Sequence, residues 1–97
     1  SNRQASGLNE KQKMQEVSVW LYPNPTHSSN TIVFSAQGQT TVRLIDITGQ
    51  ELKTIFEGVV HGKTSIVNDV SQMPAGLYIY KIESSHGFQA VRFMKSN

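Results

Sequence analysis

The side chains that could do chemistry in this chain of 97 residues are few, and their spacing does not bring them together. The three histidines, His27, His61 and His86, fall in predicted loops or turns, and no two have the short spacing that places two imidazoles on one metal ion. Ser and Thr are plentiful, but none lies in a Gly-x-Ser-x-Gly sequence, the turn that exposes a serine nucleophile. Cysteine is absent, which excludes disulfides, thiolate metal sites and cysteine nucleophiles.

Two acidic residues remain as candidates because each ends a stretch in which apolar and polar residues alternate. Asp46 and Asp69 could lie near each other at strand ends and form a calcium site or an acid/base pair. Asp46 also opens an Asp-Ile-Thr-Gly turn, in which its carboxylate can accept a hydrogen bond from the backbone two residues on. Turn capping explains Asp46 without a metal ion or a second carboxylate. We therefore expect no catalytic residue, no metal site and no cofactor, and predict that the protein is not an enzyme.

Four aromatic residues suggest binding without catalysis. Trp20, Tyr22, Tyr78 and Tyr80 could stack on a sugar ring and form a carbohydrate-binding platform. The same large side chains could instead fill the core of a small domain or cover its faces. We favour this second use.

Composition and charge exclude several other classes of protein. With 37% hydrophobic and 16% charged residues, the chain is neither a charged disordered tail nor a membrane protein, and no apolar run reaches the roughly 18 residues of a transmembrane segment. The net charge of +2 comes from basic residues that never form a run, so we expect no nucleic-acid partner. From residue 17 on, these are Arg43, Lys53, Lys63, Lys81, Arg92 and Lys95.

The pattern of apolar residues divides the chain in two. Residues 1–16 are polar and predict a linker, whereas residues 17–97 contain short β-branched and aromatic runs separated by turn signals. About seven such runs predict an all-β domain, either an antiparallel sandwich or a barrel, and the number of strands favours an immunoglobulin-like antiparallel β-sandwich. The predicted strands are residues 17–22, 31–35, 40–46, 51–57, 64–70, 77–83 and 88–95.

Alternation within the first four strands predicts the core. The expected core residues are Val19, Leu21, Ile32, Phe34, Val42, Leu44, Leu52 and Phe56. Asn68 stands where the alternation calls for an apolar residue, which indicates an edge strand or a bulge.

Four sequence blocks occur in an order that is similar to one known family. They are Tyr22-Pro23-Asn24-Pro25-Thr26, then LIDITGQEL at residues 44–52, DVSQMPAGLY at residues 69–78, and the closing run at residues 87–95. Together they resemble the C-terminal sorting domain of the type IX (Por) secretion system of Bacteroidetes. The residues carried over by this resemblance are Pro23, Asn24, Pro25, Asp46, Gly49, Gly76, Tyr78, Arg92 and Lys95.

The resemblance implies a delivery function rather than a reaction. It implies that a cargo protein upstream in the same chain is exported through the periplasm and the outer-membrane translocon to the cell surface or the medium. A surface sortase-like peptidase would then cut in the linker before Val17. The resemblance also places recognition toward the C-terminus, with Arg92 and Lys95 as a basic surface. Two alternatives stay open: a free-standing secreted module that binds a glycan or a protein, and a structural spacer.

Overall fold

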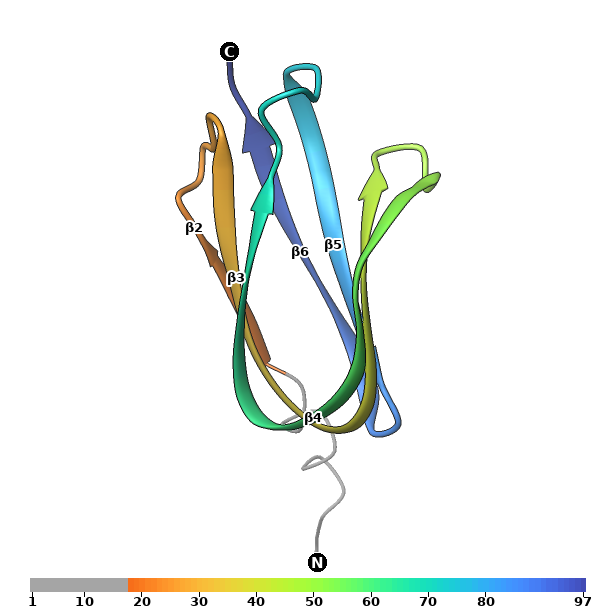
Figure 1. Ribbon diagram of the computed structural model, residues 1–97. Helices are drawn as coiled ribbons and strands as arrows, with labels where there is room; N and C mark the ends of the chain where they lie inside the picture. Colours follow the sequence, from red (N-terminus) through yellow and green to blue (C-terminus); the bar gives the residue numbers. More distant parts are fainter. Residues whose placement is uncertain (1–17) are drawn as a thin grey trace, which may run out of the picture.

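The computed structural model describes residues 18–97, which form one antiparallel sheet of five strands. The predicted linker, residues 1–16, lies outside the described residues. The strands are β2 (Ser18–Tyr22), β3 (Ser29–Asp46), β4 (Glu51–Asp69), β5 (Gly76–Ser84) and β6 (Gly87–Lys95) (Figure 1). Residues 18–97 contain no helix, so the all-β prediction is confirmed.

Two of the strands are long and bent, and they replace four of the predicted ones. β3 contains both residues 31–35 and residues 40–46, and β4 contains both residues 51–57 and residues 64–70. Pairing continues through each bend, where Gly38 lies opposite Val60 and Gly62 opposite Ala36. Gly38 and Gly62 have φ of 96° and 102°, a conformation that glycine adopts at little cost because it lacks a Cβ. The glycines therefore bend the strands rather than end them.

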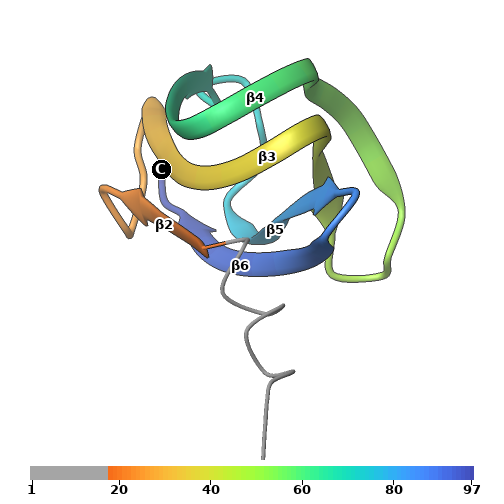
Figure 2. The same ribbon diagram turned by 90° about the horizontal axis from the view of Figure 1, so that it is seen from below.

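The sheet forms a half-barrel of five strands, and the predicted sandwich of about seven strands is not confirmed. β4 pairs with one edge of β3 along nearly its whole length. The other edge of β3 is divided, because β2 pairs with residues 31–35 and β5 pairs with residues 40–46. β6 pairs with β5, and a parallel bridge from Thr26 to Lys95 brings the end of β6 next to the segment that follows β2 (Figure 2).

The core lies inside this bent sheet and follows the predicted alternation closely. Ile32, Phe34, Val42 and Leu44 are fully buried, and the predicted core residues Val19, Leu21 and Phe56 are partly buried against them. The other buried core residues are Ala36, Val60, Val70, Tyr78, Tyr80, Ile82 and Phe93.

Leu52 is the exception, because its side chain is 44% exposed. Leu44 lies opposite Lys53 but Ile45 lies opposite Glu51, so Leu52 is an extra residue in the ladder. An inserted residue of this kind interrupts the pairing and redirects the side chain. The prediction that Leu52 is a core residue is therefore wrong.

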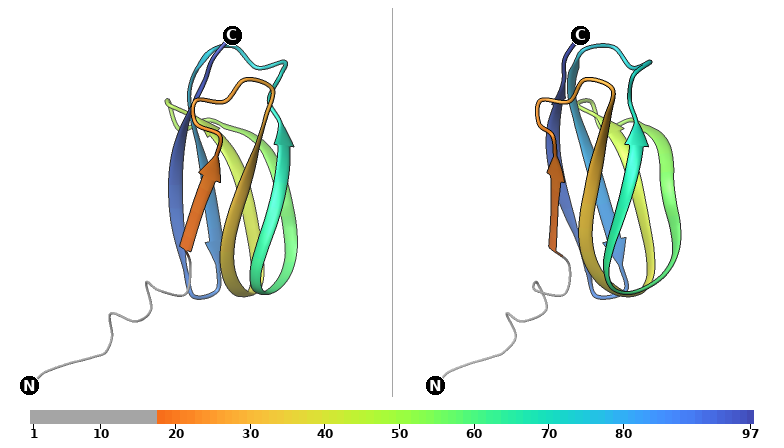
Figure 3. Two further views of the ribbon diagram at one scale, coloured as in Figure 1. Left: turned by 90° about the vertical axis from the view of Figure 1, so that its left-hand side faces the viewer. Right: turned by 60° about the vertical axis from the view of Figure 1, so that its left-hand side comes forward.

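The loops divide between two ends of the molecule. One end carries the loop between β2 and β3, the turn between β3 and β4, the loop between β4 and β5, and the C-terminus (Figures 1 and 3). We call it the motif end. The opposite end carries the start of β2, the bends of β3 and β4, and the hairpin between β5 and β6 (Figures 1 and 3).

Candidate functional site

The Pro-Asn-Pro segment at the motif end holds the C-terminal strand in place. The backbone N–H of Thr26 donates to the carbonyl of Met94 at 2.7 Å, and the N–H of Ser96 donates to the carbonyl of Thr26 at 2.8 Å. The N–H of Met94 donates to the side-chain Oδ1 of Asn24 at 3.0 Å. We call this set of residues, Asn24, Thr26, Met94 and Ser96, the C-terminal clasp.

The clasp brings together two sequence blocks that lie 70 residues apart. Pro23 and Pro25 flank Asn24, and the peptide bond before each of them is cis. Gly76 lies opposite Lys95 in the ladder between β5 and β6, so the third block also meets the C-terminal strand. Most residues singled out by the resemblance thus gather around the end of β6.

A chain of buried hydrogen bonds runs from the clasp into the core. Asn30 Nδ2 donates to Thr26 Oγ1 at 3.2 Å, and the Tyr80 hydroxyl donates to Asn30 Oδ1 at 2.6 Å. Asn68 Nδ2 donates to the Tyr80 hydroxyl oxygen at 2.9 Å, and the Thr26 hydroxyl donates to the carbonyl of Pro23. We call Thr26, Asn30, Asn68 and Tyr80 the core network; none of them is more than 5% exposed.

The burial of this network has an electrostatic consequence for Tyr80. Burial raises the pKa of its phenol above the ordinary value of 10.0, and the hydrogen bonds with Asn68 and Asn30 offset part of the rise. Charging a phenol costs more in an apolar interior than in water. Burial therefore adds to the preference of Tyr80 for its neutral form.

The core network also explains Asn68. Asn30 and Asn68 lie directly opposite each other in the ladder between β3 and β4, with no register shift there. Asn68 does lie on an edge strand, but the alternative of a bulge at that position is wrong. Both asparagines stand at inward positions of their strands, which is the sequence signal for a buried polar pair.

Two of the four aromatic residues are part of the core and cannot bind a sugar. The Phe93 ring stacks on Tyr80 with 4.8 Å between centroids and on Tyr78 with 5.8 Å. The Tyr78 hydroxyl donates to the carbonyl of Pro74 at 2.7 Å. Trp20 and Tyr22 are half exposed instead, and Lys63 Nζ lies 5.4 Å from the centre of the Trp20 ring.

Each candidate carboxylate caps its own turn. Asp46 Oδ1 accepts from the backbone N–H groups of Thr48 at 2.9 Å and Gln50 at 3.0 Å, and from the Thr48 hydroxyl at 2.6 Å. Gly49 has φ of 92°, as the predicted turn requires. The hydrogen bond from the Thr48 side chain is the main cause that lowers the pKa of Asp46. The turn-capping explanation of Asp46 is thus confirmed.

Asp69 behaves in the same way. Its Oδ1 accepts from the backbone N–H of Ser71 at 2.9 Å, and hydrogen bonds from Ser71 lower its pKa. Residues 18–97 contain no group of three histidine, aspartate or glutamate side chains that could hold a metal ion, and they enclose no pocket.

The two basic residues of β6 point to opposite faces of the sheet. Arg92 is exposed, whereas Lys95 is only 4% exposed and its Nζ donates to the carbonyl of Ser96 at 3.0 Å. The expectation that both present their charge to solvent is wrong for Lys95. The two positions differ by three, and side chains an odd number of positions apart on a strand point to opposite faces.

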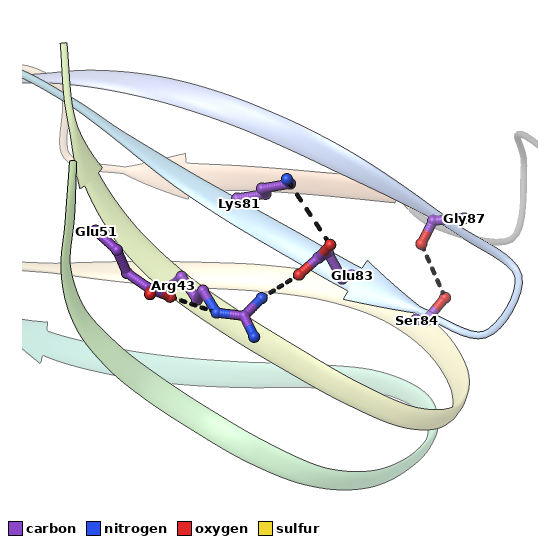
Figure 4. A network of polar contacts seen from close by, with 6 residues as sticks. All are labelled: Arg43, Glu51, Lys81, Glu83, Ser84 and Gly87. Carbon is purple, nitrogen blue, oxygen red and sulfur yellow. Dashed lines mark hydrogen bonds and ion pairs between the residues drawn. The ribbon is translucent and has the colours of Figure 1, made fainter. Parts of the chain in front are cut away.

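A second polar cluster lies on the outer face of the sheet, away from the clasp. Arg43 on β3 forms ion pairs with Glu51 on β4 and with Glu83 on β5, and Lys81 Nζ lies 3.7 Å from Glu83 (Figure 4). We call these four residues the surface network. The nearby hairpin is closed by the Ser84 hydroxyl, which donates to the carbonyl of Gly87 at 3.3 Å (Figure 4).

The chain was compared with known protein families and with curated proteins. A family model described as a secretion system C-terminal sorting domain matches residues 20–96. No curated protein is similar enough to count as a match. Within residues 18–97 there is no helix long and apolar enough to cross a membrane.

Proposed function

The chain belongs to the family of secretion system C-terminal sorting domains, and on this basis we propose that it directs an attached cargo protein through the outer membrane. Membership of this family indicates a sorting signal of the type IX secretion system and no reaction of its own. The proposed partners are the outer-membrane translocon and a cargo domain upstream in the same chain. The proposed route runs through the periplasm to the cell surface or the medium.

One observation carries this proposal: the family match extends over residues 20–96 and therefore includes every block that resembles the sorting domain. The contacts at the motif end support it. The Pro-Asn-Pro segment and the end of β6 are bound to each other through Asn24 and Thr26, so the two blocks act as one structural unit. A receptor that binds the C-terminal strand would then also depend on the Pro-Asn-Pro segment.

The proposal includes removal of the domain after export. A sortase-like peptidase at the surface would cut in the linker before Val17, where the chain is polar and contains few large apolar residues. The cut would separate the cargo from a domain whose strands begin at Ser18.

Export of a fusion protein tests the sorting function directly. Residues 17–97, placed behind a Sec signal and a fluorescent cargo in a bacterium with a type IX system, should bring the cargo to the cell surface. Surface labelling and periplasmic fractionation measure the outcome. Cargo that stays in the periplasm while the domain is folded would overturn the proposal.

Arg92 is the sharper test of C-terminal recognition. Its side chain is exposed on β6, so Arg92→Glu should leave the fold intact and lower export, whereas Arg92→Lys should preserve export. Lys53→Glu makes the same charge change at an exposed position of β4 and serves as the matched control. Equal export by Arg92→Glu and the control would rule out a basic recognition surface there. Lys95 is unsuitable for this test because it is buried.

A second candidate function rests on Trp20 and Tyr22, whose half-exposed rings stand two residues apart on the outer face of β2. Neighbouring exposed rings can stack on sugar rings, which would suit a glycan-binding module. Titration of the chain with soluble polysaccharides, followed by Trp20 fluorescence, checks this candidate. Loss of a signal in Tyr22→Ala would support it, and the absence of any signal would exclude it.

A further inference from the structure

Strand β4 has one edge that no other described strand covers. Among the strands of residues 18–97, β4 pairs with β3 alone, although it is 19 residues long. An edge strand presents unpaired N–H and C=O groups that can pair with another chain. Folded proteins therefore protect such edges with bulges, charged side chains or proline.

The first half of β4 carries this protection. Two register shifts interrupt its pairing with β3, one between Val42 and Arg43 and one between Leu44 and Ile45. Its exposed side chains include Glu51, Lys53 and Glu57. Bulges twist an edge away from a partner, and closely spaced charged side chains disfavour its approach, so this half is poorly suited to strand addition.

The second half is less protected, because its exposed charged side chains, Lys63 and Asp69, stand six positions apart. Pairing with β3 is regular from Gly58 to Asp69, with no register shift and no proline. Val59 and Val67 face outward and are 61% and 70% exposed. A regular β-branched edge with exposed valines is the kind of strand that accepts another strand.

We propose that residues 63–69 of β4 pair antiparallel with the same residues of a second copy of this chain, around a twofold axis at Ile66. A twofold interface must be self-complementary, so each residue meets its mirror position. In this register Lys63 lies opposite Asp69 at both ends of the interface, and Ser65 lies opposite Val67 twice. Opposite charges at directly facing positions stabilise a strand pair, and like charges destabilise it.

Charge complementarity selects this register over its neighbours. An axis at Lys63 would place two lysines opposite each other and Glu57 opposite Asp69. An axis at Thr64 would leave both charges without an opposite partner. An axis at Val60 would match Glu57 with Lys63 over residues 57–63, but Gly62, with φ of 102°, bends the strand inside that segment. Only the axis at Ile66 pairs Lys63 with Asp69 within the regular half.

The side chains available for this pairing are accessible. Lys63 and Asp69 are both exposed, and hydrogen bonds from Ser71 lower the pKa of Asp69 and so favour its charged form. In the single chain Lys63 Nζ lies 5.4 Å from the centre of the Trp20 ring, and pairing with a second copy would turn this flexible side chain toward Asp69. Because the two strands run antiparallel, the motif ends of the two copies point in opposite directions. None of the clasp residues lies within residues 63–69, so this pairing does not rest on the proposed sorting function.

Disulfide trapping tests the register in the full chain, which has no cysteine of its own. Facing residues of adjacent strands have Cα atoms about 4.5 to 5.5 Å apart, within the range that a disulfide can bridge. An equimolar mixture of S65C and V67C chains should form the mixed disulfide several-fold faster than either chain alone forms its own. V59C, exposed on the same edge, serves as the control and should remain monomeric. If S65C alone forms its disulfide faster than the mixture does, the register is wrong. If S65C, V67C and V59C all form disulfides at similar rates, the interface itself is wrong.

Charge reversal tests the same pairing without a covalent link. Sedimentation equilibrium of the unmodified chain should show an average mass rising from 10.8 kDa toward twice that value as concentration increases. Lys63→Glu should weaken the association at least tenfold, and Lys63→Glu combined with Asp69→Lys should restore it. Lys53→Glu, in the protected half, should leave it unchanged. A monomer at millimolar concentration, or a charge swap that fails to restore association in a folded variant, contradicts the proposal.

Discussion

The core network and the surface network are both clusters of four polar residues, but they depend on opposite physical conditions. Thr26, Asn30, Asn68 and Tyr80 are neutral and buried, and they bond to one another at 2.6 to 3.2 Å. The surface network is charged, half exposed and spread over three neighbouring strands. The first joins the clasp through Thr26, and the second lies on the outer face of β3, β4 and β5.

The difference shows which polar contacts determine the structure of this domain. A buried polar group that loses its partner costs about 1 to 3 kcal/mol, because water cannot replace the lost bond. An exposed ion pair contributes about 0 to 1 kcal/mol, because water and salt compete with it. The core network should therefore hold the strands in register, whereas the surface network should be nearly dispensable.

The largest expected effect is that of Asn30→Ala. This change leaves the Tyr80 hydroxyl and the Thr26 hydroxyl without their bonds to Asn30. We expect a loss of about 2 to 4 kcal/mol in the free energy of unfolding, measured by urea denaturation with circular dichroism. Gln39→Ala, an exposed amide on the same strand, is the control and should change it by about 0.5 kcal/mol or less. A loss for Asn30→Ala as small as the control's would contradict the role given to the core network.

Tyr80→Phe should have the next largest effect. The ring keeps its stacking on Phe93, but Asn30 and Asn68 each lose a hydrogen-bond partner. The expected loss is about 1 to 3 kcal/mol by the same measurement. Tyr22→Phe removes an exposed hydroxyl and is the matched control, for which no measurable loss is expected.

The raised pKa of Tyr80 predicts how the free energy of unfolding changes with pH. Its folded-state pKa is raised, so the unfolded chain loses this proton first as the pH rises through about 10. Stability from the neutral phenol is therefore fully present below about pH 10 and is lost as the pH rises toward the folded-state pKa. Denaturation between pH 8 and 11 should show a steeper loss in the natural chain than in Tyr80→Phe. Equal slopes would mean that the phenol ionises as easily in the folded chain as in the unfolded one.

Asn24→Ala tests the clasp itself, and its effect on the free energy of unfolding should lie between those of Tyr80→Phe and Glu83→Gln. It removes the acceptor for the N–H of Met94, a bond at the surface. We expect a loss of about 0.5 to 1.5 kcal/mol and faster hydrogen exchange at the Met94 amide than at the amides of β3. Unchanged exchange at Met94 would show that the side chain of Asn24 does not hold the C-terminal strand.

Glu83→Gln should have the smallest effect. It removes the carboxylate that both Arg43 and Lys81 contact. We expect a loss of about 1 kcal/mol or less, which should shrink further in 0.5 M salt because mobile ions screen exposed charges. A loss that equals that of Asn30→Ala would remove the distinction between the two networks.

Alternation along each strand predicted the inward faces of β3 correctly, because side-chain direction on a strand has a period of two residues. The same rule would also have separated Arg92 from Lys95. It failed for Leu52, because a bulge shifts the period and the pattern alone does not locate the bulge.

Gly38 and Gly62 show the limit of turn signals. A glycine with positive φ can end a strand or bend it, and the local sequence is the same in both cases. Only the hydrogen bonds to the neighbouring strand decide between the two, and β3 and β4 keep theirs through the bend. This is why five strands replace the predicted seven or so.

The sequence by itself determined the all-β class, most of the core and the capped turn at Asp46, since each depends on residues a few positions apart. It also determined the family, since the four blocks can be read without knowing where they lie. Tertiary structure alone decided that Asn24 binds the Met94 amide, that Asn30 and Asn68 meet at Tyr80, and that Lys95 is buried. These contacts join positions 12 to 70 residues apart, and the pairing of distant strands that creates them depends on the register of the whole sheet.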